Sequence, residues 1–377
     1  MRILISIRPY FGHLHPHVPL ASALVRRGHS VLFATAASFC PAVREAGFEC
    51  RAAGLHPRDP LPAEHEGLPY ARDYGVYAVK TKCHDLLELA TAEPPDVIVR
   101  DPTDVGAVVA AEVLGVPCLT LGFSEYIPPS SWDILLASGL DQVRACWEVA
   151  GDPGWERMHP SGYFNLVPRP FRQGSVPIPG EFPLRPVCQQ TLEPPRPVAW
   201  LGQLPAQPTV HLTLGTAYNF HTQLMASLAD WLSQLPISVI CTAGPESDLA
   251  DLAVIAERQN AYVTDYIPLE LILPHCDAVV TAGGFNTVMA ALQYGLPLLV
   301  LPLGADQPRN AERVATLGAG LSMAAADADQ GAVVNAIHDL LVQPSYRVVA
   351  SRLQEHIANM PGPDAAAAHL EGLCQRR

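Results

Sequence analysis

The stretch from residue 277 to 307 limits the fold of this chain more than any other. Residues 277–281 and 297–303 are mostly apolar runs without alternation, the pattern of parallel strands buried on both faces. Between them, Gly283-Gly284 permits a tight turn, and residues 286–292 have helical spacing. The stretch therefore predicts a βαβ unit in a parallel sheet.

Two features of this unit indicate a ligand site. Asn286 and Thr287 open the expected helix, and a helix N-terminus offers unpaired N–H groups and a partial positive charge that suit a phosphate. Asp306 and Gln307 follow the second strand, at the edge where open α/β sheets bind ligands. A purely structural βαβ unit explains the glycine turn equally well, but the Asp-Gln pair favours a nucleotide-linked ligand.

The same alternation of strands and helices runs through two halves of the chain. The expected strands are residues 2–7, 30–35, 48–52, 96–101 and 117–121 in the first half, and 210–214, 237–242, 261–266, 278–281 and 298–301 in the second. Residues 168–208, between the halves, are dense in proline and have no sustained period. The expected fold class is therefore α/β, with two doubly wound, Rossmann-like domains facing each other across a cleft.

The expected domain boundaries follow from this division. The N-terminal domain spans residues 1–190, a proline-rich linker spans 191–208, and the C-terminal domain spans 209–360. Residues 361–377, which begin with Pro361-Gly362-Pro363, form a last helix that we expect to pack back on the N-terminal domain.

Composition excludes several classes of partner. The formal net charge of −13 disfavours nucleic acid and anionic membranes. No stretch approaches the roughly 20 apolar residues of a membrane span, and the apolar run at residues 3–7 is too short for a signal peptide. The nine cysteines are scattered without a CxxC motif, which argues against a disulfide framework. We therefore expect a cytoplasmic protein without nucleic-acid or membrane partners.

Three alternate histidines, His13, His15 and His17, lie between the first strand and the first helix. A metal site of the amidohydrolase type also has an HxH at the end of its first barrel strand. That fold requires further ligands and eight βα units, and the proline-rich middle of this chain interrupts the series. Polar loop residues are the simpler interpretation of His15 and His17.

His13 has a candidate partner far away in the sequence. In a doubly wound sheet of order 3-2-1-4 the first and fourth strands are neighbours, which brings His13 near Asp101. A carboxylate on one ring nitrogen fixes the tautomer and stabilises the imidazolium, while the other nitrogen removes a proton from a substrate hydroxyl. Asp104 is an alternative partner for His13, and a helix N-cap is the alternative role of Asp101.

Two further groups in the second half have ligand-binding chemistry. The turn at Gly215-Thr216 can bind phosphate through N–H and hydroxyl groups, although an ordinary N-cap explains it as well. Tyr266, at the end of the third strand of this half, can stack on a nucleobase or belong to the core.

Together these residues resemble the GT-B glycosyltransferases that decorate plant and bacterial natural products, and most closely the bacterial antibiotic and enediyne glycosyltransferases. The resemblance covers nearly the whole chain. It is carried by Gly12-His13, Asp101, Leu214-Gly215-Thr216, Gly283-Gly284, Gly304-Ala305-Asp306-Gln307 with Asn310-Ala311, and Met360-Pro361-Gly362-Pro363. Each motif is weak alone, but their order and spacing together are specific.

The resemblance implies a role for each candidate residue. His13 would be the general base for an acceptor hydroxyl, with Asp101 as its partner. The implied donor-binding residues are Thr216, Gly283, Gly284, Phe285, Asn286 and Thr287 near the diphosphate, Tyr266 and the Ile267 backbone at the base, and Asp306 and Gln307 at the sugar hydroxyls. The implied acceptor-binding residues are Phe11, Tyr74, Phe123, Tyr126 and Trp132.

The implied reaction is an inverting transfer of the hexosyltransferase type. It needs no metal and no cofactor beyond a nucleoside diphosphate sugar of the dTDP or UDP type. The sugar, expected to be a deoxysugar, would move to a hydroxyl of a hydrophobic natural-product acceptor. Loop 55–72 and the aromatic region 123–164 of the acceptor-binding N-terminal domain would shape the pocket. The C-terminal domain would bind the donor, and a monomer and a homodimer are both compatible with the sequence.

Three positions depart from the family pattern. Ala282 and Ala290 stand where the family usually has a histidine that contacts the diphosphate and a glutamate that contacts the ribose, and Asn286 stands where it usually has glycine. A lost hydrogen bond to a charged group is worth roughly 1.5–3 kcal/mol. These positions keep two alternatives open: a non-catalytic helper of a glycosyltransferase, and a nucleotide-sugar epimerase of the same fold.

Overall fold

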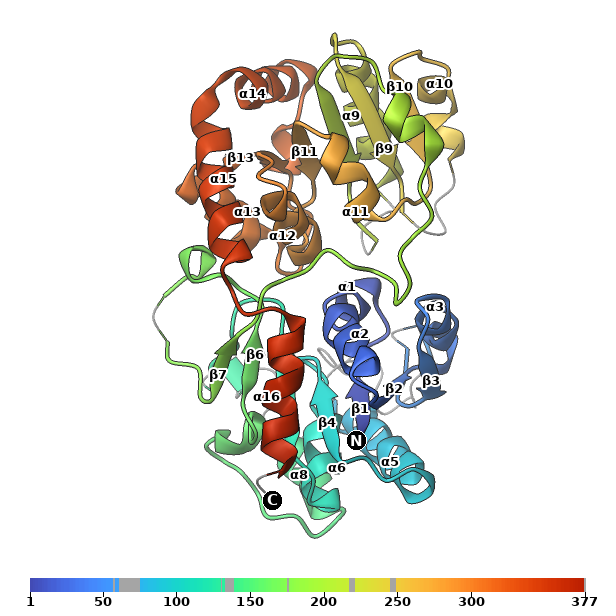
Figure 1. Ribbon diagram of the computed structural model, residues 1–377, viewed down its shortest axis with the longest axis vertical. Helices are drawn as coiled ribbons and strands as arrows, with labels where there is room; N and C mark the ends of the chain where they lie inside the picture. The colour runs from blue at the N-terminus through green and yellow to red at the C-terminus, as the bar shows by residue number, and fades with distance from the viewer. Residues whose placement is uncertain are drawn as a thin grey trace.

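The computed structural model describes residues 1–56, 58–60, 75–129, 131–132, 139–174, 176–216, 221–244 and 249–375. They form two α/β domains, each built around one parallel sheet (Figure 1). The fold class expected from the sequence is confirmed. Tyr74 and most of loop 55–72 lie outside the described residues.

The N-terminal domain contains a seven-stranded sheet of order β3-β2-β1-β4-β5-β6-β7. Its strands are β1 (Arg2–Ser6), β2 (Ser30–Thr35), β3 (Glu49–Ala52), β4 (Val97–Arg100), β5 (Cys118–Gly122), β6 (Tyr163–Asn165) and β7 (Glu181–Pro183). Its helices include α1 (Phe11–Leu14), α2 (Val18–Arg26), α3 (Cys40–Glu45), α5 (Val76–Ala92), α6 (Gly106–Leu114) and α8 (Gly139–Ala145). β1 and β4 pair in parallel, as expected, so both strands end at the same edge of the sheet.

The C-terminal domain repeats this arrangement with a six-stranded sheet of order β10-β9-β8-β11-β12-β13. Its strands are β8 (Thr209–Thr213), β9 (Ser238–Thr242), β10 (Ala261–Thr264), β11 (Ala278–Thr281), β12 (Leu298–Val300) and β13 (Gly320–Ser322). The helices that follow the linker are α9 (Thr222–Ser233), α10 (Ala253–Ala256), α11 (Leu269–Ile272), α12 (Phe285–Gln293), α13 (Gln307–Leu317), α14 (Gln330–Val342), α15 (Pro344–Ala358) and α16 (Pro363–Gln375). Among the described residues, no helix is both long and apolar enough to cross a lipid bilayer.

The central strands have the burial that their sequences predict. Every residue of β4, β8 and β11 is buried, as expected for apolar runs covered on both faces. Three strands, β6, β7 and β13, were not expected from the sequence. Each has only three residues, too few for a period to be recognised, and the first two lie in the aromatic and proline-rich regions.

The chain crosses between the domains twice. On the first crossing, the Leu192 N–H donates to the Ala46 carbonyl of the N-terminal domain, and the Trp200 ring stacks on Tyr262 of the C-terminal domain. On the second crossing, the chain leaves α15 and enters α16, which lies side by side with α2 (Figure 1). Arg27 after α2 forms a bidentate pair with Glu371 of α16, which fixes the last helix on the N-terminal domain.

The turn after β11 depends on its first glycine. Gly283 has a φ of 90°, and a Cβ added there would lie 2.4 Å from Val300 Cγ1. Gly284 has a φ of −58°, and a Cβ added there would have no neighbour within 4 Å. Only the first glycine is therefore required by the backbone.

We expect Gly283→Ala to lower the free energy of unfolding by at least about 1–2 kcal/mol, the cost of the left-handed conformation before the clash with Val300 is added. The matched control, Gly284→Ala, should cost less, about 0.5–1 kcal/mol, because its φ of −58° suits alanine and only the preference for glycine over alanine at an N-cap is lost. Urea unfolding of the ligand-free protein measures both. Equal effects of the two substitutions would contradict this interpretation of the turn.

Candidate active site

His13 is presented by a single helical turn directly after β1. The sequence placed His13 between the first strand and the first helix, whereas in the structure α1 begins at Phe11 and α2 at Val18. The short helix α1 was not expected, because one turn of helix has no periodic signal. The His13 side chain remains 19% exposed.

Asp101, at the end of β4, accepts a hydrogen bond from His13 Nδ1 at 3.0 Å, the contact that the strand order predicted. The carboxylate is fully buried. Its Oδ2 also accepts from the Arg8 N–H at 2.7 Å, and its Oδ1 accepts from the backbone N–H groups of Thr103 and Asp104 at 2.7 and 2.9 Å. The side chain therefore caps its own turn and contacts the histidine at the same time.

These bonds keep the Asp101 carboxylate charged. Burial alone would raise its pKa, but the charge of His13, its hydrogen bond and the Arg8 N–H together hold the pKa of Asp101 well below its ordinary value. Because the ionised Asp101 can only accept a hydrogen bond, a neutral His13 has its hydrogen on Nδ1. The lone pair of His13 Nε2 is then able to take a proton.

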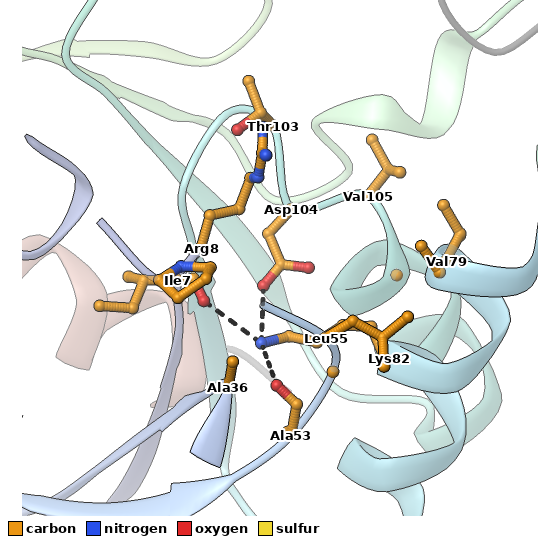
Figure 2. Close-up of a pocket in the computed structure, with 14 residues that line it drawn as sticks. Ile7, Arg8, Ala36, Ala53, Leu55, Val79, Lys82, Thr103, Asp104 and Val105 are labelled. Atoms are coloured by element: carbon orange, nitrogen blue, oxygen red, sulfur yellow. Dashed lines mark hydrogen bonds and ion pairs between the residues drawn. The ribbon is translucent and has the colours of Figure 1, made fainter. Parts of the chain in front are cut away.

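Asp104, the alternative partner of His13, is engaged elsewhere. One of its oxygens accepts from Ser6 Oγ at 2.6 Å and lies 3.2 Å from Lys82 Nζ. Lys82 Nζ also donates to the carbonyls of Ile7 and Ala53, at 3.3 and 3.2 Å (Figure 2). A further bond, of 3.1 Å, goes to the Ala34 carbonyl. One buried ammonium thus joins the ends of β1, β2 and β3 to the loop after β4.

A hollow of about 440 Å³, open to solvent, lies over this ammonium. Arg8, Val79 and Thr103 are among its lining residues, and Thr103 also donates to Asp101 (Figure 2). The hollow is therefore adjacent to the histidine–aspartate pair, on the edge of the sheet where a ligand is expected.

The facing domain presents two matching turns. β8 and β11 are paired neighbours that end on Thr213 and Thr281, which lie opposite each other. Each threonine hydroxyl accepts a hydrogen bond at 3.2 Å from the glycine two residues on, Gly215 or Gly283, and both glycines have positive φ. Thr216 follows the first of these turns and is partly exposed. Successive N–H groups in such turns can bind anions.

The N-terminus of α12 lies beside the second turn and reaches the other domain. Gly284 is its N-cap without a side-chain bond, so its first N–H groups have no capping side chain. Thr287 is partly exposed in this first turn, and Phe285 is buried. Asn286 Nδ2 donates to the Gly12 carbonyl of α1 at 3.1 Å, directly before His13.

Asp306 and Gln307 hold the turn between β12 and α13. The Gln307 side-chain oxygen accepts from the Leu303 and Gly304 N–H groups at 2.8 and 3.0 Å, and Asp306 accepts from Asn310 Nδ2 at 2.8 Å. Burial raises the pKa of Asp306, while the Asn310 amide and the charge of His13 act in the opposite direction.

Tyr266 is held by Gln190, the last residue before the interdomain linker. Its hydroxyl donates to Gln190 Oε1, while 36% of the residue remains exposed, so the ring is fixed but accessible. Ile267, the next residue, is buried. A second hollow of about 400 Å³ lies between Gln190 and α12, with Asn286 in its wall. The sequence did not single out Gln190, because no pattern predicts the path of a proline-rich segment over the other domain.

The predicted acceptor residues have different surroundings. Phe123 packs edge-on against His13 with ring centroids 5.0 Å apart, and Phe11 packs edge-on against Phe39. Tyr126 is partly buried against Tyr163. Trp132 is 1% exposed in a hydrophobic cluster, so it presents no surface to a ligand and is removed from the candidate acceptor residues.

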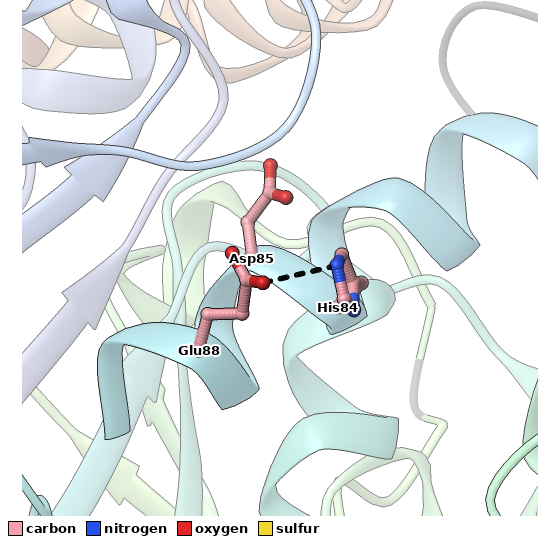
Figure 3. A group of neighbouring side chains, drawn as sticks. All are labelled: His84, Asp85 and Glu88. Carbon is pink, nitrogen blue, oxygen red and sulfur yellow. Dashed lines mark ion pairs between the residues drawn. The ribbon is translucent and has the colours of Figure 1, made fainter. Parts of the chain in front are cut away.

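The histidine series does not gather a metal site among the described residues. His17 is fully buried and donates from Nδ1 to the His13 carbonyl, which corrects its interpretation as a polar loop residue. The group that could hold an ion in the described part of the chain is His84, Asp85 and Glu88 on α5 (Figure 3). Two of these side chains are exposed, and none belongs to the cleft, so we assign this group no function.

Comparison with known proteins identifies relatives of this chain, first by sequence and then by structure. Residues 226–373 match the erythromycin biosynthesis protein CIII-like, C-terminal domain family. The L-demethylnoviosyl transferase of Streptomyces niveus is 31% identical over 98% of this chain and 97% of its own. The chain belongs to the family of natural-product glycosyltransferases.

Solved structures agree with this assignment. The glycosyltransferase SnogD from Streptomyces nogalater is 26% identical, covers 99% of both chains and has a TM-score of 0.76. The glycosyltransferase VinC, in complex with dTDP, covers 100% of both chains with a TM-score of 0.83 at 22% identity, a likeness of fold. The two domains therefore form a GT-B glycosyltransferase, as the resemblance implied.

Ala282 and Ala290, the two alanines expected to depart from the family pattern, belong to the core. Ala282 is 1% exposed and Ala290 is 2% exposed, and both pack among hydrophobic residues. In the described structure, both positions are therefore surrounded by apolar side chains. The glutamate nearest to this region in the sequence, Glu270, has a buried side-chain oxygen without a hydrogen-bond partner, and burial raises its pKa to about 6.

The two lysines of the chain provide a matched test of the buried ammonium. Lys82→Met should lower the free energy of unfolding by about 3–5 kcal/mol, because it leaves the buried Asp104 carboxylate without its cation. Lys80→Met, at an exposed position two residues earlier, should change it by less than about 0.5 kcal/mol. Thermal and urea unfolding measure both. Similar values for the two variants would refute the assigned role of Lys82.

Proposed function

We propose that this glycosyltransferase moves a sugar, of the deoxysugar type, from a nucleoside diphosphate to a hydroxyl of a hydrophobic natural-product acceptor, with inversion and without a metal ion. The observation that carries the proposal is the pair of His13 and buried Asp101, which faces the N-terminus of α12 across the interdomain cleft. A base on one side and an anion site on the other are the two requirements of a displacement at an anomeric carbon.

In this reaction the acceptor hydroxyl gives its proton to His13 Nε2. The oxygen then forms a bond to the anomeric carbon from the face opposite the diphosphate, and the bond from that carbon to the phosphate oxygen breaks. The anionic Asp101, held by Arg8 and Thr103, stabilises the imidazolium that forms. In-line attack of this kind inverts the anomeric configuration.

The donor site proposed for the leaving diphosphate consists of the two glycine turns, Thr216, Thr287 and the N-terminus of α12. N–H groups at a helix N-terminus stabilise developing negative charge without a cation, so the proposed site needs no metal and no cofactor other than the sugar nucleotide. Tyr266 offers an accessible ring to a nucleobase, and Asp306 and Gln307, in the turn before α13, are the proposed partners of the sugar hydroxyls.

A donor of the dTDP or UDP type is proposed from the relatives. VinC was crystallised with dTDP, and the Streptomyces enzyme SsfS6 with thymidine diphosphate. The hollow between Gln190 and α12, of about 400 Å³, lies directly beside Asn286. The hollow over Lys82, whose lining residue Thr103 donates to Asp101, is the proposed start of the acceptor pocket.

We expect His13→Ala to lower kcat by about 10²–10⁴-fold, the usual contribution of a general base, while the dissociation constant for the nucleoside diphosphate changes by less than about threefold. His84→Ala, at an exposed position outside the cleft, is the matched control and should retain full turnover. Transfer assays and calorimetry measure the two quantities. Unchanged turnover in His13→Ala would exclude the assigned base.

Calorimetric titration with dTDP, UDP and GDP tests the donor site itself. We expect saturable binding of dTDP or UDP, because the glycine turns and the α12 N-terminus are intact despite Ala282 and Ala290. Binding of none of the three would favour the helper alternative. Conversion of the donor sugar in the absence of any acceptor, detected by NMR, would favour the epimerase alternative.

A further inference from the structure

The hydrogen bond between Asn286 and Gly12 joins the two domains at the reacting centre. Asn286 is the second residue of α12 in the donor-binding domain, and its Nδ2 donates to the Gly12 carbonyl at 3.1 Å. Gly12 precedes His13 in α1. A side chain of the donor domain thus contacts the peptide that carries the proposed base.

The short helix that carries His13 has little support of its own. It contains four residues, and its N-cap, Tyr10, makes no side-chain capping bond. A single turn is only marginally stable in isolation, so its orientation depends on contacts from outside. Three hydrogen bonds from outside hold it, with Asp101 at the His13 ring, His17 at the His13 carbonyl and Asn286 at the Gly12 carbonyl. The packing of Phe123 against His13 and of Phe39 against Phe11 adds to them.

The Asn286 amide can contact a second group. A carboxamide has two N–H donors, and the described residues provide Nδ2 with one acceptor, the Gly12 carbonyl. The first turn of α12, where this amide is located, is the diphosphate site of the proposed function. The same nitrogen can therefore donate to a phosphate oxygen while it holds Gly12.

We propose that Asn286 is a positioning residue that sets the distance between the base and the leaving group by bridging the Gly12-His13 peptide and the donor diphosphate. The proposal rests on the proposed function for the role of His13 as base and for the contact with the diphosphate. The bond to Gly12 is present in the structure, and a glycine at position 286, having no side chain, could make neither contact.

The bridge has a chemical consequence for turnover. A displacement of about 1 Å at a reacting centre can lower the rate on the order of 100-fold. Loss of the bridge should therefore lower kcat at saturating donor and acceptor, whereas loss of a simple phosphate contact would mainly weaken donor binding.

The test compares four variants of the full chain. Asn286→Ala removes the amide, Asn286→Asp keeps its size without N–H donors, and Asn286→Gln restores the donors on a longer side chain. Arg313→Gln is the control, because Arg313 makes a different interdomain bond, to the carbonyls of Phe171 and Pro170. The measurements are kcat, the dissociation constant for dTDP, and the ¹⁵N NMR signals of the His13 ring in the ligand-free protein.

We expect Asn286→Ala and Asn286→Asp to lower kcat about 10- to 100-fold and to shift the His13 ring signals before any ligand is added. Asn286→Gln should restore part of kcat, and Arg313→Gln should leave both quantities unchanged. Unshifted His13 signals in Asn286→Ala, or a kcat within about twofold of the wild type, would overturn the proposal.

Failure of the proposed function can be distinguished from failure of this inference. A wild-type protein that binds no nucleoside diphosphate and transfers no sugar would contradict the proposed function. The NMR comparison in the ligand-free protein would still decide whether Asn286 positions His13.

Discussion

The buried carboxylate of Asp101 is the group on which the rest of the site depends. A charge removed from water is costly unless it is fully hydrogen-bonded, and Asp101 accepts bonds from Arg8, Thr103, Asp104 and His13. These donors come from the end of β1, the loop after β4 and α1. The bonds that make the charge tolerable are therefore the same bonds that orient the base.

The sequence predicts those parts of the fold that repeat or that follow from strand order. The long apolar strands were recognisable, and the contact of His13 with Asp101 followed because parallel neighbours end at one edge. The bonds of Lys82 were not predictable, since they depend on three strand ends and one loop meeting at a single atom. Trp132 was misjudged because aromatic residues serve cores and pockets alike.

The two domains contact each other both at the cleft and at its margins. Asn286 contacts Gly12 at the centre, whereas α16 secures the C-terminal segment to α2. One continuous hydrophobic cluster also contains residues of both domains. The domains are thus held close enough for groups on opposite sides to influence one another.

The bond between Gln190 and Tyr266 bears on the construction of hybrid enzymes. A hybrid enzyme with the donor domain of a relative would naturally be fused within the proline-rich segment, because a fusion point there interrupts no strand of either sheet. Gln190 lies before that segment in sequence but contacts the donor half. If the two parents are fused after residue 190, Tyr266 comes from one parent and residue 190 from the other. The tyrosine of the donor domain then loses the hydrogen bond to glutamine that holds its ring in this chain.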